Sequence, residues 1–138
     1  MTGFGVIMHN KVVSSWIRQA RYRAKRQNIH SDLDISDIIS IINEFEGKCA
    51  YCSNQHDTLD HPFPIKDQAP SVAANILPIC KACKKVKKNN DLVWMFLNNK
   101  IIKEEYLRLL KGLFSRGGGS MIKAHVKKLT GYEGSDIG

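Results

Sequence analysis

The chain has 138 residues, which suits one small domain, and its 43% hydrophobic content argues against disorder throughout. Its net charge of +8 favours a polyanionic partner, nucleic acid before a membrane, although a merely soluble basic protein would carry the same charge. Residues 1–8 do not resemble a signal peptide, and no stretch approaches the ~20 apolar residues that cross a bilayer. We therefore expect a cytoplasmic protein without membrane contact, whose cysteines are reduced.

Two helices are predicted within residues 1–48. The segment 11–27 has no helix breaker and is rich in arginine, so we expect a basic helix that contacts phosphate groups, with a solvated face as the alternative. A second helix should start at Ser36-Asp37 and end at Gly47, because apolar residues recur there at i, i+3, i+4 and i+7 and form one buried stripe. The arginines expected to bind nucleic acid are Arg18, Arg21, Arg23 and Arg26.

The segment 49–90 is predicted to form a module of two short strands and a helix. Residues 58–60 and 75–77 are the expected strands, with Pro78 ending their pairing, and three prolines make the loop between them irregular. The helix should begin at Cys80 and carry the second cysteine pair in its first turn. The sequence thus predicts an α+β fold in which helices flank a small module.

Further helices are predicted in 91–115, followed by a flexible basic tail in 116–138. Asp91 should cap a helix over 92–97, and an amphipathic helix should run from Lys103 to about Phe114 and pack on the module. The run from Gly117 to Ser120 is typical of a flexible linker.

Four cysteines form two pairs, Cys49-x-x-Cys52 and Cys80-x-x-Cys83. A Cys-x-x-Cys turn places two thiolates on one ion without strain, so the two pairs predict a four-sulfur zinc site. A thiol-redox role is the alternative, but it needs only one pair and a thioredoxin-like context. Because four protein ligands leave no position open for substrate, the predicted zinc is structural.

Between the cysteine pairs lie Asp60-His61, Pro64 and Asn75, and Lys87 follows the second pair. In this order and spacing, residues 47–90 resemble the HNH endonucleases, which have the ββα-metal (His-Me finger) fold. The sequence that leads into Cys49 is similar to that of phage-encoded members, which act in the cytoplasm of the host cell. The resemblance implies a metal-dependent hydrolase that cuts phosphodiester bonds in DNA, most often duplex DNA.

Carried over by position, the resemblance implies a role for each residue of this group. His61 would be the general base that deprotonates the attacking water. Asp60 would hold a catalytic Mg²⁺ or Mn²⁺ ion. Asn75 would fix the loop and hydrogen-bond the imidazole. Singly, each residue is more typical of a surface or a turn, but together they favour the nuclease.

Lys84 departs from the family pattern, in which a His or Asn ligand of the catalytic ion usually follows the second cysteine pair. A protonated lysine cannot coordinate a cation, yet Lys84 lies only about 40° around the helix from Cys80 and should approach the site. Three outcomes are open: an ion held by Asp60, water and substrate alone; a contact between Lys84 and the scissile phosphate; or lost catalysis on a scaffold that binds nucleic acid or a host protein. We favour retained activity.

The predicted helix after Cys80 also carries four other lysines, which either hold the DNA backbone beside His61 or form a solvated face. One site per chain implies that a monomer nicks DNA and that a double-strand break needs a homodimer or two encounters. The lysines are Lys81, Lys85, Lys87 and Lys88.

Overall fold

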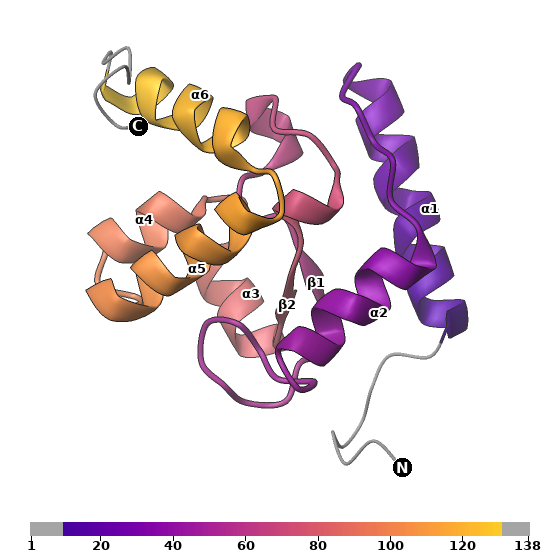
Figure 1. Ribbon diagram of the computed structural model, residues 1–138, viewed down its shortest axis with the longest axis horizontal. Helices are drawn as coiled ribbons and strands as arrows, with labels where there is room; N and C mark the ends of the chain where they lie inside the picture. Colours follow the sequence, from indigo (N-terminus) through magenta and orange to yellow (C-terminus); the bar gives the residue numbers. More distant parts are fainter. Residues whose placement is uncertain (1–9, 131–138) are drawn as a thin grey trace.

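The computed structural model describes residues 10–130, except for the side chains of Asn10, Val126 and residues 128–130; the expectations for residues 1–8 and for the end of the tail, 131–138, fall outside that range. Helices surround a sheet of two short antiparallel strands (Figure 1), so the predicted α+β class is confirmed. None of the helices in the described range combines the length and apolar character that a bilayer-spanning segment needs.

Helices α1 (Asn10–Arg26) and α2 (Ile35–Glu44) pack on one side of the sheet. The cap of α2 is Asp34, whose Oδ1 accepts the Asp37 N–H at 3.0 Å, so the helix begins one residue before the predicted start. The isoleucine stripe of α2 is buried, as its spacing predicts. It forms a core with Val13 and Ile17 of α1, with Leu59 of the first strand and with Ile76 just before the second.

Strands β1 (Thr58–Asp60) and β2 (Leu77–Ile79) pair antiparallel, with Leu59 opposite Pro78. The prediction that Pro78 ends the pairing is wrong, and β2 lies two residues further along the chain than expected. A strand with one neighbour has a free edge and therefore tolerates the missing N–H of proline. The Pro78 carbonyl accepts the Ala50 N–H at 2.9 Å. Asn75 lies before the strand, in the 3-10 turn η2 (Ala73–Asn75).

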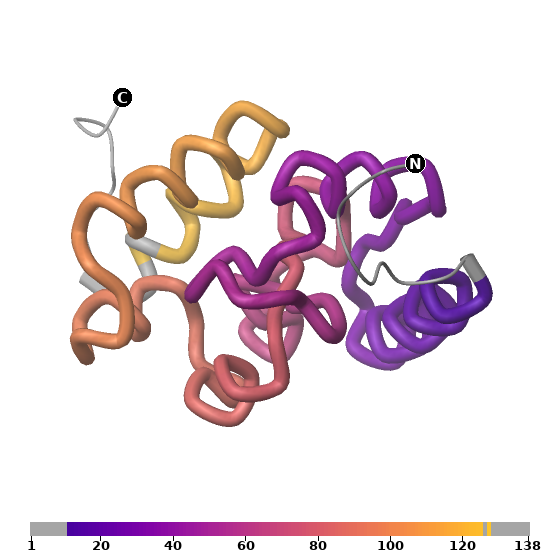
Figure 2. Tube along the Cα trace, turned by 90° about the horizontal axis from the view of Figure 1, so that it is seen from below, coloured from indigo at the N-terminus to yellow at the C-terminus, as the bar shows by residue number. Residues whose placement is uncertain are grey.

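The second core lies on the other side of the sheet. It joins Leu77 and Ile79 of β2 to helices α4 (Leu92–Leu97) and α5 (Lys103–Ser115) and to the cysteine loops. Helix α3 (Lys81–Lys87) follows β2 directly. Asp91 caps α4 as predicted, since its Oδ1 accepts the Trp94 N–H at 2.7 Å. Figure 2 shows the separation of the two halves, with α1 on the right and α5 and α6 on the left.

The glycine run is a helix cap, where the sequence predicted a flexible linker. Gly117 has a φ of +95°, and the N–H groups of Gly117 and Gly118 bond to the Phe114 and Leu113 carbonyls, which ends α5 in a Schellman motif. A Cβ on Gly118 would lie 2.8 Å from the Leu113 carbonyl oxygen. The glycines therefore serve a tight turn.

Helix α6 (Gly119–Thr130) follows that turn and corrects the expectation of a flexible tail for residues 116–130. Ile122 is buried in the second core. His125 is also buried; its Nε2 lies 2.6 Å from Asp91 Oδ2, and its ring packs edge-on against Phe63 at 4.8 Å between centroids. A buried apolar contact and a polar contact thus fix α6 to the body of the protein.

Candidate functional site

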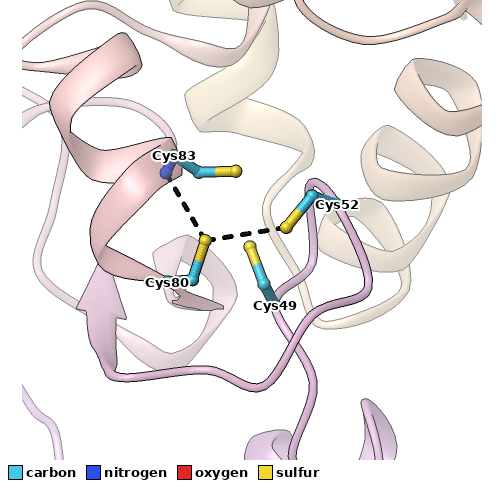
Figure 3. A group of neighbouring side chains, drawn as sticks. All are labelled: Cys49, Cys52, Cys80 and Cys83. Carbon is cyan, nitrogen blue, oxygen red and sulfur yellow. Dashed lines mark hydrogen bonds between the residues drawn. The ribbon is translucent and has the colours of Figure 1, made fainter.

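The four cysteines converge from two turns, as Figure 3 shows. Cys49 and Cys52 come from the loop between α2 and β1, and Cys80 and Cys83 from the start of α3. Their sulfur atoms all lie within 4.8 Å of one another, and Cys52 Sγ is 3.6 Å from Cys80 Sγ. Sulfurs in a tetrahedral site with metal–sulfur bonds of ~2.3 Å are about 3.8 Å apart. The cluster can therefore hold a metal ion.

Backbone hydrogen bonds fix the shape of the turn that carries Cys49 and Cys52. The Ser53 N–H donates to the Cys49 carbonyl at 3.0 Å, with Ser53 in the left-handed region at a φ of +67°. The Ala50 N–H bonds to Pro78 and so attaches the turn to β2. The Tyr51 N–H donates to Cys49 Sγ at 3.4 Å.

Burial works against the thiolate form of two of these cysteines unless a cation is bound. It raises the pKa of the Cys49 thiol to about 11 and also raises the pKa of Cys83. A metal ion supplies the positive charge that stabilises buried thiolates, so metal binding is coupled to folding in such clusters. The donor set and its surroundings therefore fit a metal.

Asp60 ends β1, and its buried carboxylate is already engaged. Lys87 Nζ lies 3.2 Å from both carboxylate oxygens, and the Tyr51 hydroxyl donates to Oδ2 at 2.9 Å. Lys87 is only 1% exposed and also donates to the His61 carbonyl at 3.2 Å. Lys87 thus differs from the exposed Lys81, Lys85 and Lys88: its ammonium is a buried partner of Asp60 and not part of an outer basic face.

His61 follows Asp60 directly and is held from two sides. Its Nε2 lies 2.9 Å from Ser71 Oγ, and the Trp16 indole of α1 stacks on the imidazole at 5.3 Å between centroids and 30° between planes. Burial, aided by the cationic side chains of Arg23, Lys87 and Lys84, lowers the pKa of His61 to about 3. The imidazole is therefore neutral at neutral pH and has a free lone pair, although burial and these cations make it a weaker base than an exposed histidine until an anion is bound.

Asn75 braces the loop that begins at His61. Its Nδ2 donates to the Phe63 and Pro70 carbonyls at 2.7 and 2.9 Å, and its Oδ1 accepts the Phe63 N–H at 3.0 Å. These contacts agree with the expected loop-fixing role. The expected hydrogen bond from Asn75 to the imidazole is not among them, because Ser71 is the partner of the ring.

His61 lines a cavity of about 260 Å³ between α1 and α3. Of the four predicted arginines, Arg23 lines it, while Arg21 bonds to the Leu33 carbonyl. Lys84 Nζ donates to the Leu59 carbonyl at 3.2 Å, so Lys84 does approach the site. The cationic residues of the described lining are Arg23, Lys66, Lys84, Lys87 and Lys88. Such a cavity suits an anion.

A catalytic divalent ion fits these residues poorly. Among the described residues that line the cavity, Asp60 is the only carboxylate, and both of its oxygens already accept hydrogen bonds. The ammonium groups of Lys84 and Lys87 lie on the same cavity and would repel a cation. The positive charge here comes from the protein itself.

Comparison with known proteins assigns no family: no protein-family model matches the chain, and no curated protein does so. The fold and the site define a class only, an α+β protein with a four-cysteine cluster and a neutral histidine in a cationic cavity.

Three residues that contact the Asp60-His61 dipeptide were not predicted: Tyr51, Trp16 and Ser71. Tyr51 lies inside the first cysteine turn, and Trp16 and Ser71 lie in other segments. In the sequence each is an ordinary core or loop residue. Only the tertiary packing brings them to the dipeptide.

The buried ion pair predicts the effect of changing Lys87. Lys87→Met leaves the Asp60 carboxylate buried without its cation and should lower the free energy of unfolding by about 3 kcal/mol. Urea unfolding followed by circular dichroism measures this loss. Lys85→Met is the matched control, because Lys85 is exposed on the same helix and should change stability little. Equal losses for the two variants would contradict the structural role of Lys87.

Proposed function

We propose that the protein is an endonuclease of the HNH type that hydrolyses phosphodiester bonds in DNA, with structural zinc in the four-cysteine cluster. The order β1, loop, β2 and α3, with Asp60-His61 at the end of β1, supports a ββα module. The observation that carries the proposal is the position of His61, whose neutral imidazole lines a cavity with the cationic side chains of Arg23 and Lys84.

The chain itself supplies a base and fixed positive charge for this chemistry. A phosphodiester in the cavity lies against Lys84 and Arg23, which stabilise the negative charge that develops on the phosphorane. Water attacks phosphorus as His61 takes its proton, a new P–O bond forms, and the bond to the 3′ oxygen breaks. The 3′ oxygen then takes a proton from solvent. Asn75 keeps the loop, and hence His61, in place.

His61 should be essential for nicking. His61→Ala should slow the relaxation of supercoiled plasmid at least about 100-fold, because the general base is lost. His30→Ala is the matched control, since His30 is an exposed histidine paired with Asp32. If His61→Ala nicks as fast as the control variant and the unmodified protein, the catalytic assignment of His61 is wrong.

Zinc should be required for the fold. We expect one zinc ion per chain by elemental analysis, and loss of cooperative thermal unfolding after chelation or in Cys83→Ser, because Cys49 and Cys80 belong to the second core. Zinc, but not Mg²⁺, should restore the transition of the chelated protein. A metal-free chain that still melts cooperatively at the same temperature would contradict a structural zinc.

Nicking should need a high concentration of added divalent ion, because such an ion fits the surroundings of Asp60 poorly. We expect nicking to require millimolar Mg²⁺ or Mn²⁺, with Mn²⁺ favoured. Lys84→Asn introduces the residue type usual in the family that the sequence resembles; removing the ammonium should lower the ion concentration for half-maximal nicking about tenfold. A plasmid-nicking assay over a range of ion concentrations measures this concentration for the unmodified protein and for Lys84→Asn. Saturation of the unmodified protein at micromolar Mg²⁺ would contradict this expectation.

A protein that binds nucleic acid without cutting it is the second candidate. It is favoured by two contacts: the Trp16 indole stacks on one face of the His61 ring, and Lys87 forms a buried ion pair with the Asp60 carboxylate. Binding to duplex DNA that weakens steeply with salt, without nicking at any metal concentration, would select this function.

A further inference from the structure

Among the side chains that the structure describes, Ser71 is the one that hydrogen-bonds the His61 ring. Ser71 Oγ lies 2.9 Å from His61 Nε2. Within the same part of the chain, His61 Nδ1 has no hydrogen-bond partner, and the ring lines the cationic cavity. The two nitrogens thus have different surroundings: Nε2 faces a buried hydroxyl, and Nδ1 is free for substrate or water.

Ser71 is itself rigidly placed. It is 0% exposed, and its N–H donates to the His30 carbonyl at 2.9 Å, next to a parallel bridge between Ser31 and Ser71. This bridge connects the segment that follows α1 to the loop that Asn75 braces. The hydroxyl of Ser71 therefore has a fixed position beside the imidazole.

The charge around the cavity favours one neutral tautomer of His61. A serine hydroxyl can either accept the Nε2–H or donate to Nε2, so Ser71 alone allows both tautomers. The cationic side chains of Arg23, Lys84 and Lys87 lie near the ring. Positive charge near the cavity attracts a lone pair on Nδ1 and repels an N–H there. This charge favours the arrangement in which Nε2–H donates to Ser71 Oγ.

We propose that Ser71 is a positioning residue that holds His61 as the Nε2–H tautomer, with the Nδ1 lone pair directed to the cavity. The assignment of Nδ1 as the base rests on the proposed nuclease function. In that reaction, Ser71 determines which ring nitrogen of His61 takes the proton from water. Ser71 acts through His61 and touches no reacting atom.

Nitrogen-15 NMR of the histidine side chains tests the tautomer without any need for activity. In the zinc-loaded, unmodified protein we expect a pyridine-like Nδ1 and a pyrrole-like Nε2 for His61, assigned by the signals that His61→Gln removes. Ser71→Ala leaves the cations in place but removes the acceptor of the Nε2–H, so the ring should shift toward a mixture of tautomers. Ser71→Thr, which keeps the hydroxyl, should retain the original pattern. A protonated Nδ1 in the unmodified protein would overturn the proposal even if the Ser71 variants do not fold.

Ser31→Ala is the matched control for the loss of a hydroxyl. Ser31 takes part in the same bridge, but its buried Oγ has no hydrogen-bond partner in the described structure, so its removal should leave the His61 signals unchanged. An identical His61 spectrum in Ser71→Ala and Ser31→Ala, both melting as the unmodified protein does, would also overturn the proposal.

Plasmid nicking adds a second readout and separates this inference from the proposed function. Ser71→Ala should lower kcat about 10- to 100-fold with KM unchanged, as for other residues that orient a functional histidine, and Ser71→Thr should restore most of it. A rise in KM at constant kcat would contradict positioning. If the unmodified protein does not nick DNA, the proposed function fails, while the NMR pattern still decides the tautomer.

Discussion

The buried ion pair between Lys87 and Asp60 is the contact on which the geometry of the site depends. Two charges withdrawn from water are stable only where their geometry is good and their other hydrogen bonds are made. Here the Tyr51 hydroxyl adds a bond to the carboxylate, and the His61 carbonyl accepts a second bond from the ammonium. The first cysteine turn, the end of β1 and the end of α3 meet at this point. Any displacement of α3 is therefore transmitted directly to the backbone of His61.

The same pair determines the electrostatic character of the cavity. Asp60 is the only carboxylate in the described lining, and Lys87 neutralises it. The charges of Arg23, Lys84 and Lys88 therefore have no other carboxylate opposite them there. Like charges close together repel, and a bound anion relieves that repulsion whereas a divalent cation increases it. The arrangement thus places fixed positive charge where a phosphodiester would develop negative charge, which is the electrostatic part of the proposed chemistry.

Local signals in the sequence predicted most helices, because periodicity and caps act over a few residues. The isoleucine stripe of α2 and the Asp91 cap are of this kind. The errors arose where one residue type serves two purposes. Pro78 usually ends a strand, but β2 has a free edge that accepts it. Glycines are typical of flexible linkers and also of helix C-caps, and only the hydrogen bonds of Gly117 and Gly118 decide between the two.

The motif supplied the residue types of the candidate site, but the surroundings of His61 come largely from outside it. Trp16 and Arg23 are about two turns apart on α1, so they face the cavity from the same side of that helix. Their position depends on the core between α1 and the sheet, where Val13 and Ile17 meet Leu59 and Ile76. No pattern within residues 49–90 encodes that packing. The segment 49–90 alone would lack both the indole that covers the imidazole and one cationic wall of the cavity, so α1 belongs to the site as much as the cysteine module does.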